Sequence, residues 1–351
     1  MKNGTIAALS LLAACTDYVL RDLAESAPQT EAPPGSAPEP SEPATVLPVD
    51  APCGVVELVM VSATPSPGFQ SDGVLELVLI PRDADGNVVL DCDWSVVAAA
   101  DSTLATGVTS VVAIPQDPLP TVFALDFDSS GSMSGADPEM LRIPAAQTFI
   151  SLTEAARPEN LHGVFTFPRE NVFPFVVTEM LAAFTDDAAA ARAAVATLGV
   201  PSGFTPLFES AVEVLGHQDD VTGPDFRTAL VLFSDGQPSD VDFTIDDLLG
   251  VAAATGTTIH TVGLGVASQT GDSPNADAIE VMQRLAFETG GSYSSATEAS
   301  DLEATFTNLA ASLAGHIVVT IVFAAPPAAG VFVSGTISVE DVGSTWSFIA
   351  P

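Results

Sequence analysis

The sequence predicts an α/β protein with a doubly wound parallel sheet, flanked by an all-β sandwich module. Three observations lead to this prediction. From Thr121 onward, short apolar runs alternate with helical stretches, which is the pattern of such a sheet. Residues 53–118 show only strand-like runs and turn signals, and strand-like runs return after His316. The length of 351 residues leaves room for two cores.

Residues 1–14 have the features of a secretory signal peptide. Lys2 supplies the positive charge, and the following apolar stretch is too short for a bilayer, which needs about 20 residues. The stretch ends in Leu12-Ala13-Ala14-Cys15, which resembles the lipobox of bacterial lipoproteins. That resemblance implies a lipid on Cys15 and a place in the bacterial cell envelope, at the outer membrane since Thr16 is not aspartate. An ordinary signal peptide with a chance cysteine is the alternative.

Residues 15–52 follow as a tether. The stretch 26–52 is rich in proline, alanine, serine and glutamate, cannot form a core and should be extended. The chain has three cysteines. If Cys15 carries lipid, Cys53 and Cys92 remain as a pair, and an oxidising compartment favours a disulfide between them. Two free thiols or half of a metal site are the other interpretations.

The β module is expected over residues 53–118. Its turn Asp83-Ala84-Asp85-Gly86-Asn87 is a hairpin signal, and the stretch Leu75–Val97 around it resembles bacterial immunoglobulin-like domains. The turn could also be a calcium loop, although its glycine is fourth rather than sixth. Residues 316–351 either complete this β-sandwich or form a separate hairpin on the α/β domain. The expected strands are Val55–Val61, Val74–Ile80, Val88–Leu90, Trp94–Ala99, Val108–Ile114, Ile317–Phe323, Gly330–Val339 and Thr345–Ile349.

The α/β domain is expected over residues 119–315. Its strands are predicted at Val122–Phe127, Gly163–Phe167, Val172–Val177, Thr228–Phe233, Thr258–Leu264 and Ser292–Ser295. Its helices are predicted at Glu139–Ala156, Asp186–Leu198, Pro206–Leu215, Ile245–Ala254, Ala276–Thr289 and Leu302–Leu313.

Oxygen-bearing side chains follow two of these buried strands. Functional groups of open α/β sheets gather at the carboxyl ends of strands. Hard oxygen donors suit Mg²⁺, or else Mn²⁺ or Ca²⁺. Asp126 shares a face of its strand with Asp128 and either supports a metal ligand or is a buried acid with its own partner. The predicted metal ligands are Asp128, Ser130, Ser132, Thr205 and Asp235.

The motif Asp128-x-Ser130-x-Ser132, with Thr205 and Asp235, resembles the metal-ion-dependent adhesion site (MIDAS) of the von Willebrand factor A (VWA) family. The stretches Thr258–Gly265 and Leu285–Tyr293 resemble later parts of the same family, so that the resemblance covers Pro120–Ala314. It implies a Rossmann-like sheet, one divalent cation and a protein partner whose acidic residue completes the coordination. Gly135 and Ala136 stand where integrin β-type domains carry further acids, which argues against adjacent calcium sites.

The net charge and the absence of catalytic motifs exclude some classes of function. Acidic residues outnumber basic ones 45 to 9, a net charge of −36, which rules out a reader of nucleic-acid phosphates. GxSxG, HExxH and GxxxxGK[ST] motifs are absent, so we expect no enzyme. The predicted function is divalent-cation-dependent, adhesion-type protein binding by an envelope lipoprotein. A metal-dependent hydrolase and a purely structural envelope protein are the alternatives.

Overall fold

The computed structural model describes residues 54–92, 94–100, 104, 106–168, 177–236, 238–269, 274–339 and 341–351. These residues all belong to the same compact unit and form three sheets and four clusters of buried hydrophobic side chains. The predicted signal peptide, Cys15, the tether and Cys53 lie outside the described residues. In the part of the chain that is described, no helix combines the length and apolar character needed to cross a bilayer.

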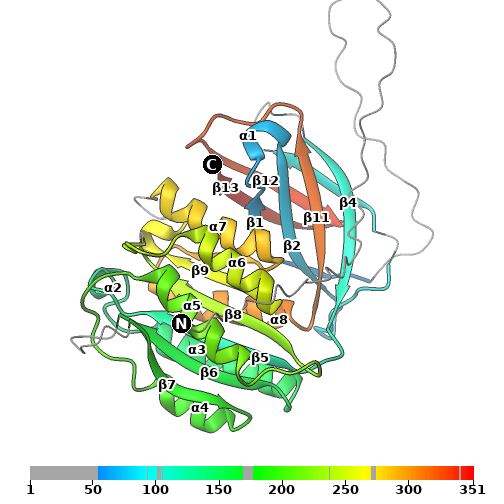
Figure 1. The fold of residues 1–351 in the computed structure, drawn as a ribbon. Coiled ribbons are helices and arrows are strands. Elements are labelled where there is room, and N and C mark those ends of the chain that lie inside the picture. The colour runs from blue at the N-terminus through cyan, green and yellow to red at the C-terminus, as the bar shows by residue number, and fades with distance from the viewer. Residues whose placement is uncertain are drawn as a thin grey trace, which may run out of the picture. The chain divides into compact units, whose positions relative to one another are not determined.

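The largest sheet confirms the predicted α/β fold class (Figure 1). Five of its six strands are parallel, and only β7, at the edge beside β6, is antiparallel. Across the sheet the strands are β10 (Tyr293–Ala296), β9 (Thr258–Leu264), β8 (Arg227–Ser234), β5 (Thr121–Asp128), β6 (Leu161–Phe167) and β7 (Glu179–Thr185).

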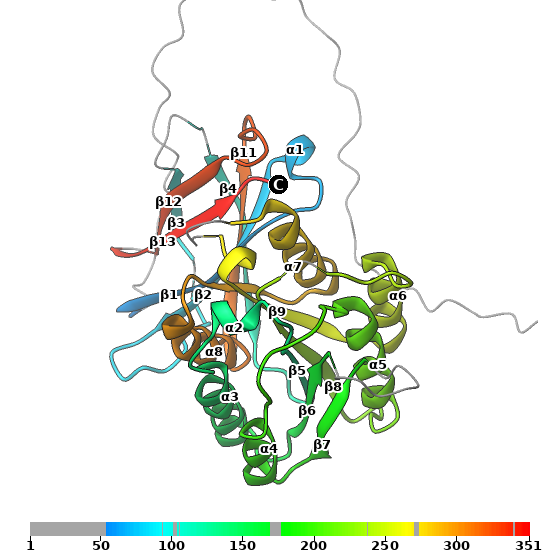
Figure 2. The same ribbon diagram turned by 90° about the vertical axis from the view of Figure 1, so that its left-hand side faces the viewer.

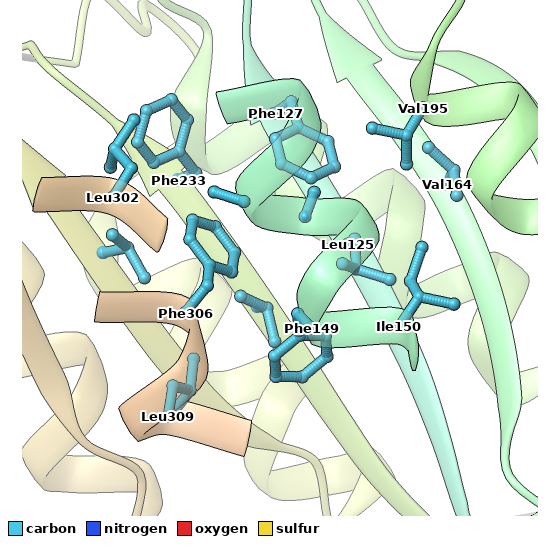
Figure 3. Close-up of a cluster of buried hydrophobic side chains, with 14 of the residues drawn as sticks. Leu125, Phe127, Phe149, Ile150, Val164, Val195, Phe233, Leu302, Phe306 and Leu309 are labelled. Atoms are coloured by element: carbon cyan, nitrogen blue, oxygen red, sulfur yellow. The ribbon is translucent and has the colours of Figure 1, made fainter. Parts of the chain in front are cut away.

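Helices cover both faces of this sheet (Figures 1 and 2). One face carries α3 (Arg142–Ala156), α4 (Ala188–Val195) and α8 (Leu302–Ser312), and the other carries α5 (Leu207–Asp219), α6 (Ile245–Thr255) and α7 (Ala276–Thr289). Successive side chains of β5 point to opposite faces of the sheet, so the strand contributes to the hydrophobic core on each face. Leu125 and Phe127 pack against Phe149 of α3 and Phe306 of α8 (Figure 3), while Ala124 joins the core on the other face.

The structure of the α/β domain differs from the sequence prediction at one helix boundary and by one additional strand. The predicted helix from Glu139 begins only at Arg142, because Met140 has a positive φ of 55° that a helix cannot contain. The strand β7 (Glu179–Thr185) was not predicted, since its half-exposed, alanine-containing sequence has no alternating pattern. The strand predicted at Val172–Val177 falls on residues that are not described, apart from Val177, which is not in a strand.

The β module consists of two antiparallel sheets with a shared core. Strand β11 lies between β2 and β4, so segments from both sides of the α/β domain share one sheet. The four-stranded sheet runs β1 (Glu57–Pro65), β2 (Val74–Arg82), β11 (Gly315–Phe323), β4 (Thr106–Pro115), and the three-stranded sheet runs β13 (Val342–Ile349), β12 (Phe332–Val339), β3 (Val96–Ala100).

Aromatic side chains fill the space between these two sheets. Phe69, Phe323 and Phe348 meet with ring centroids 5.2–5.9 Å apart, and Trp346 lies 6.2 Å from Phe323. Phe69 belongs to a short helix, α1 (Phe69–Asp72), in a region predicted to be free of helices. The predicted strand Val88–Leu90 is reduced to one bridge between Val88 and Arg82.

Candidate metal centre

The predicted metal ligands gather at the carboxyl ends of two neighbouring parallel strands. Asp128 is the last residue of β5, and Asp235 directly follows β8. The two strands are paired up to Phe127 and Phe233, which sets the two carboxylates at the same edge of the sheet. Thr205 precedes α5 on the same edge, where its backbone bonds to the loop that follows Asp235.

Hydrogen bonds connect four of the five side chains directly. The Ser130 backbone N–H donates to Asp128 Oδ1 at 2.7 Å, and the Ser130 and Ser132 hydroxyl oxygens lie 3.0 Å apart. The Ser132 hydroxyl donates to Asp235 Oδ1 at 2.8 Å. The fifth side chain, that of Thr205, lies close to Ser132. A Cβ placed on Gly236 would lie 3.6 Å from Ser132 Oγ and 3.8 Å from Thr205 Oγ1. The structure therefore brings all five predicted ligands together.

The donors fit a hard divalent cation in their chemistry. They comprise two carboxylates and three hydroxyls, and Mg²⁺, Mn²⁺ and Ca²⁺ prefer oxygen. Among the described residues no group of three or more His, Cys, Asp or Glu could hold a metal ion. Of the five residues only Ser132 is exposed, which opens the site to solvent at one point.

Burial is unfavourable for the charges of the two carboxylates. Burial raises the pKa of Asp128. Burial, and after it the charge of Asp128, raise the pKa of Asp235 to about 7. A divalent cation between them would compensate both carboxylate charges, which agrees with the chemistry of the donor set.

Serines that the sequence analysis did not single out support these ligands. The Ser234 hydroxyl donates to Asp128 Oδ2 at 2.6 Å and also accepts a bond from the Gly236 backbone at 3.1 Å. The Ser239 hydroxyl accepts from the Thr205 backbone N–H at 2.9 Å. Ser234 is the last residue of the strand before Asp235, and this position was the only feature of the sequence that indicated a role at the site. Nothing in the spacing marked Ser239.

A buried ion pair lies next to the centre. Arg142 Nη1 bonds to Asp137 Oδ2 at 2.8 Å, and both side chains are fully buried. Asp137 also accepts from the Leu141 backbone at 2.6 Å, at the beginning of α3. The positive charge of Arg142 partly offsets the rise that burial causes in the pKa values of Asp128 and Asp235. Asp137 is thus engaged with Arg142, and the sequence analysis missed this pair.

Asp126 bonds to a helix. It is fully buried on β5, and its Oδ2 accepts from the Ser210 hydroxyl of α5 at 2.9 Å. Its Oδ1 has no hydrogen-bond partner among the described residues. Burial, followed by the charges of Asp128 and Glu213, raises the pKa of Asp126 to about 8.

The remaining sequence candidates lie in the β module. Cys92 is disulfide-bonded, while Cys53, its predicted partner, lies outside the described residues, so that their pairing stays a prediction. The Asp83 carboxylate accepts bonds from the Asp85 and Asn87 backbones, both at 2.9 Å, and from the Asn87 side chain. These bonds lower the pKa of Asp83, the Asn87 side chain most of all, and they account for the turn without a cation.

Comparisons with known proteins gave structural likeness only. Neither a scan against protein-family models nor a search of curated proteins found a match. Similar solved structures include proximal thread matrix protein 1 from the mussel byssus, with 14% identity over 57% of this chain and 49% of that chain and a TM-score of 0.42. A second structure of that protein is described as having a zinc-occupied MIDAS motif.

Two bacterial structures resemble the chain to a similar degree. A von Willebrand factor type A protein from Catenulispora acidiphila shares 11% identity over 84% of this chain and 74% of that chain, with a TM-score of 0.42. The vWF domain of the type V pili tip protein Mfa5 from Porphyromonas gingivalis shares 16% identity over 56% of this chain and 95% of its own, with a TM-score of 0.41. At such TM-scores the likeness is loose, and the chemistry of the centre follows from its own residues.

Proposed function

We propose that this chain is a VWA-type module that binds one divalent cation through Asp128, Ser130, Ser132, Thr205 and Asp235, and a protein partner through that cation. The observation that carries the proposal is the meeting of these five oxygen donors at one partly exposed edge of the sheet. Mg²⁺ takes six ligands. Five protein oxygens would therefore leave a position for an acidic group of the partner.

An exposed aromatic ring beside the ligands supports a protein partner over a purely structural cation. Phe204 is 80% exposed, although it directly precedes Thr205. Its other neighbour, Gly203, accepts a bond from the Gly131 backbone at 3.2 Å, so the loop that carries Phe204 contacts the loop of Ser130 and Ser132. Val241, two residues after Ser239, is 94% exposed. Exposed apolar groups of this kind are typical of contact surfaces, where aromatic anchors contribute most to affinity.

We propose no catalytic role. A metal-dependent hydrolase would need a general base beside the ion. His162 bonds to Thr153, and His260 bonds to Ser292, so neither is directed at the metal ligands. A cavity of about 360 Å³ does exist, but it is lined by Thr121, Arg227 and other residues at the amino ends of the strands, away from the metal ligands.

We also propose that lipid on Cys15 anchors the protein to the bacterial envelope, at the outer membrane. The lipobox-like stretch before Cys15 and the proline-rich tether after it support this anchoring. Radiolabelled palmitate should be incorporated into the protein in bacterial cells and not into a Cys15→Ser variant. Equal labelling of both would contradict lipidation at this residue.

The test of the cation is a calorimetric titration of Mg²⁺, Mn²⁺ and Ca²⁺ into the full-length protein. We expect saturable one-site binding that is abolished in Asp128→Ala and weakened at least tenfold in Thr205→Ala. Asp220→Ala, which removes an exposed acid at the far end of α5, is the matched control and should bind normally. Equal weak heats in all proteins would show that the acidic surface only collects counterions.

A partner is then sought by retention on the immobilised protein with Mg²⁺ or with chelator. A partner that is retained only with Mg²⁺, and not by Asp128→Ala, supports the proposal. Retention that does not depend on Mg²⁺ or on Asp128 would contradict binding through the cation.

A further inference from the structure

We infer that Asp126 is a positioning residue of the metal centre, which holds Thr205 in place through Ser210. The inference rests on the function proposed above and adds a residue outside the five ligands. Asp126 lies two residues before Asp128 on β5, and side chains two residues apart on a strand share a face. On that face Ala124 packs into the core formed with α5, α6 and α7, so Asp126 points toward α5 from within an apolar layer.

The contact between Asp126 and α5 is a directed hydrogen bond. Ser210 Oγ donates to Asp126 Oδ2 at 2.9 Å, and Thr178 Oγ1 donates to Ser210 Oγ at the same distance. Because Ser210 accepts from Thr178, its single hydroxyl proton is available to Asp126. Asp126 and Ser210 are both 0% exposed, so water does not compete for this bond.

Ser210 lies in the first turn of α5, one helical turn after Pro206, which directly follows Thr205. The Ser210 backbone N–H donates to Pro206 O at 3.0 Å, and the Leu207 N–H donates to Thr205 O at 2.9 Å. A shift of the first turn of α5 would therefore move Thr205 with it. On the other side, Ser239 binds Thr205 twice, through its hydroxyl at 2.9 Å and its backbone N–H at 2.8 Å. Thr205 is thus fixed to the loop after β8 by Ser239, and to β5 by Asp126 through Ser210.

Core packing does not explain a carboxylate at residue 126. Asp126 Oδ1 lies buried without a partner among the described residues, and such an atom is unfavourable in the folded state. A leucine would fit the apolar layer without that cost, but it could not accept the bond from Ser210. Within the described part of the chain Asp126 makes no hydrogen bond to any of the five ligands. It can therefore influence the centre through Ser210 or through its charge.

The experiment separates these two routes with Mn²⁺ as the probe. Dissociation constants are measured for the full-length protein and for Ser210→Ala, Asp126→Asn and Asp126→Leu. We expect Ser210→Ala and Asp126→Leu to weaken Mn²⁺ binding about tenfold, as is usual when a group that supports a ligand is removed. Asp126→Asn should stay within about threefold, because its amide oxygen still accepts the bond from Ser210. Equal losses in Asp126→Asn and Asp126→Leu would show that charge acts instead, and would overturn the inference.

A double-mutant cycle with Thr205→Ala gives the decisive readout. If Ser210 acts through Thr205, Ser210→Ala should change the Mn²⁺ affinity less than about twofold once Thr205 is alanine. The same loss with and without Thr205 would overturn the inference. Thr261→Val is the matched control, since Thr261 is a fully buried hydroxyl that donates to Met282 O of α7 at 2.8 Å. It should lower the melting temperature without changing the Mn²⁺ affinity.

The outcomes also separate this inference from the proposed function. Absence of saturable Mn²⁺ binding to the unsubstituted protein would contradict both. Saturable binding with an unchanged affinity in Ser210→Ala would contradict the positioning role alone. A role of Ser210 in stability only would appear as a lower melting temperature at constant affinity, as for the control.

Discussion

Replacing either member of the buried Arg142–Asp137 pair should strongly destabilise the α/β domain. Removing one partner leaves an uncompensated buried charge, which typically costs about 3–5 kcal/mol of unfolding free energy. After Arg142→Met, Asp137 keeps the backbone N–H groups of Leu141 at 2.6 Å and of residue 142 at 3.2 Å. We therefore place Arg142→Met near the lower end of the range.

Replacing the other member of the pair, by Asp137→Asn, should cost more unfolding free energy. Of its side-chain hydrogen bonds within the described residues, Arg142 then keeps only those to the neutral amide of residue 137 and to Gly199 O, the latter a long bond of 3.5 Å, while its Nε has no partner there. The double variant Arg142→Met/Asp137→Asn should lose less than the sum of the single losses, by roughly 0.5–3 kcal/mol.

Urea unfolding in the presence of chelator measures these losses. In thermal unfolding, a loss of 3–5 kcal/mol should lower the melting temperature by roughly 6–20 °C for a domain of this size. Arg284→Ala is the matched control, because Arg284 pairs with Asp246 and Glu288 at the surface and should contribute about 1 kcal/mol or less. The reasoning is refuted if both core variants lose no more than the Arg284 variant, or if their losses simply add.

Three further predictions concern the partner surface, the response to pH and the β core. Phe204→Ser should leave the melting temperature and the Mn²⁺ affinity unchanged, because the ring is 80% exposed, yet weaken Mg²⁺-dependent retention of a partner at least tenfold. Burial lowers the pKa of His162 from 6.5 to about 4, so its contribution to stability is complete above pH 6.5 and is lost as the pH falls toward 4. In chelator, His162→Gln should flatten the decline of unfolding free energy over that range by about 3 kcal/mol. Gly335→Ala should cost about 1–3 kcal/mol in urea unfolding, since its Cβ would lie 2.2 Å from Trp346 Cζ2.

Matched controls accompany these predictions. Phe332→Ser removes another exposed ring, on β12, and should retain the partner normally. His217→Gln changes an exposed histidine of α5 and is the control for His162→Gln. Gly343→Ala adds a Cβ that meets Ile337 O at 3.6 Å, an ordinary contact, and should cost little. An effect of a control as large as that of its counterpart would contradict the corresponding prediction.

The fold class could be predicted because its central strands are unusually clear. β5 and β8 are nearly continuous apolar runs that end in polar loops, as strands buried on both faces do. β7 could not be predicted in the same way, because an edge strand that is half exposed carries little pattern in sequence. The positive φ of Met140, which delays the start of α3, depends on Asp137 and tertiary contacts that local propensity does not contain.

Some residues of the candidate site could likewise be predicted from the sequence, and others could not. Asp128 and Asp235 could be located because the carboxyl ends of adjacent parallel strands meet, a rule of topology. Ser239 could not, because its contact with Thr205 joins segments 34 positions apart without any repeated spacing. Arg142 and Asp137 are close in sequence, but nothing in their spacing marks them as a buried ion pair. The role of Asp126 was open in sequence for a related reason, since the one side-chain hydrogen bond that it makes within the described residues reaches Ser210, 84 positions later.

The position of β11 between β2 and β4 means that their sheet can be completed only after β11 has been synthesised. β2 (Val74–Arg82) and β4 (Thr106–Pro115) leave the ribosome long before Gly315, and both need β11 for one of their edges. At about 5–20 residues per second, their edges wait roughly 10–50 s for that strand. Exposed strand edges invite pairing with other chains. The chain is therefore most open to such pairing before its last strands are made.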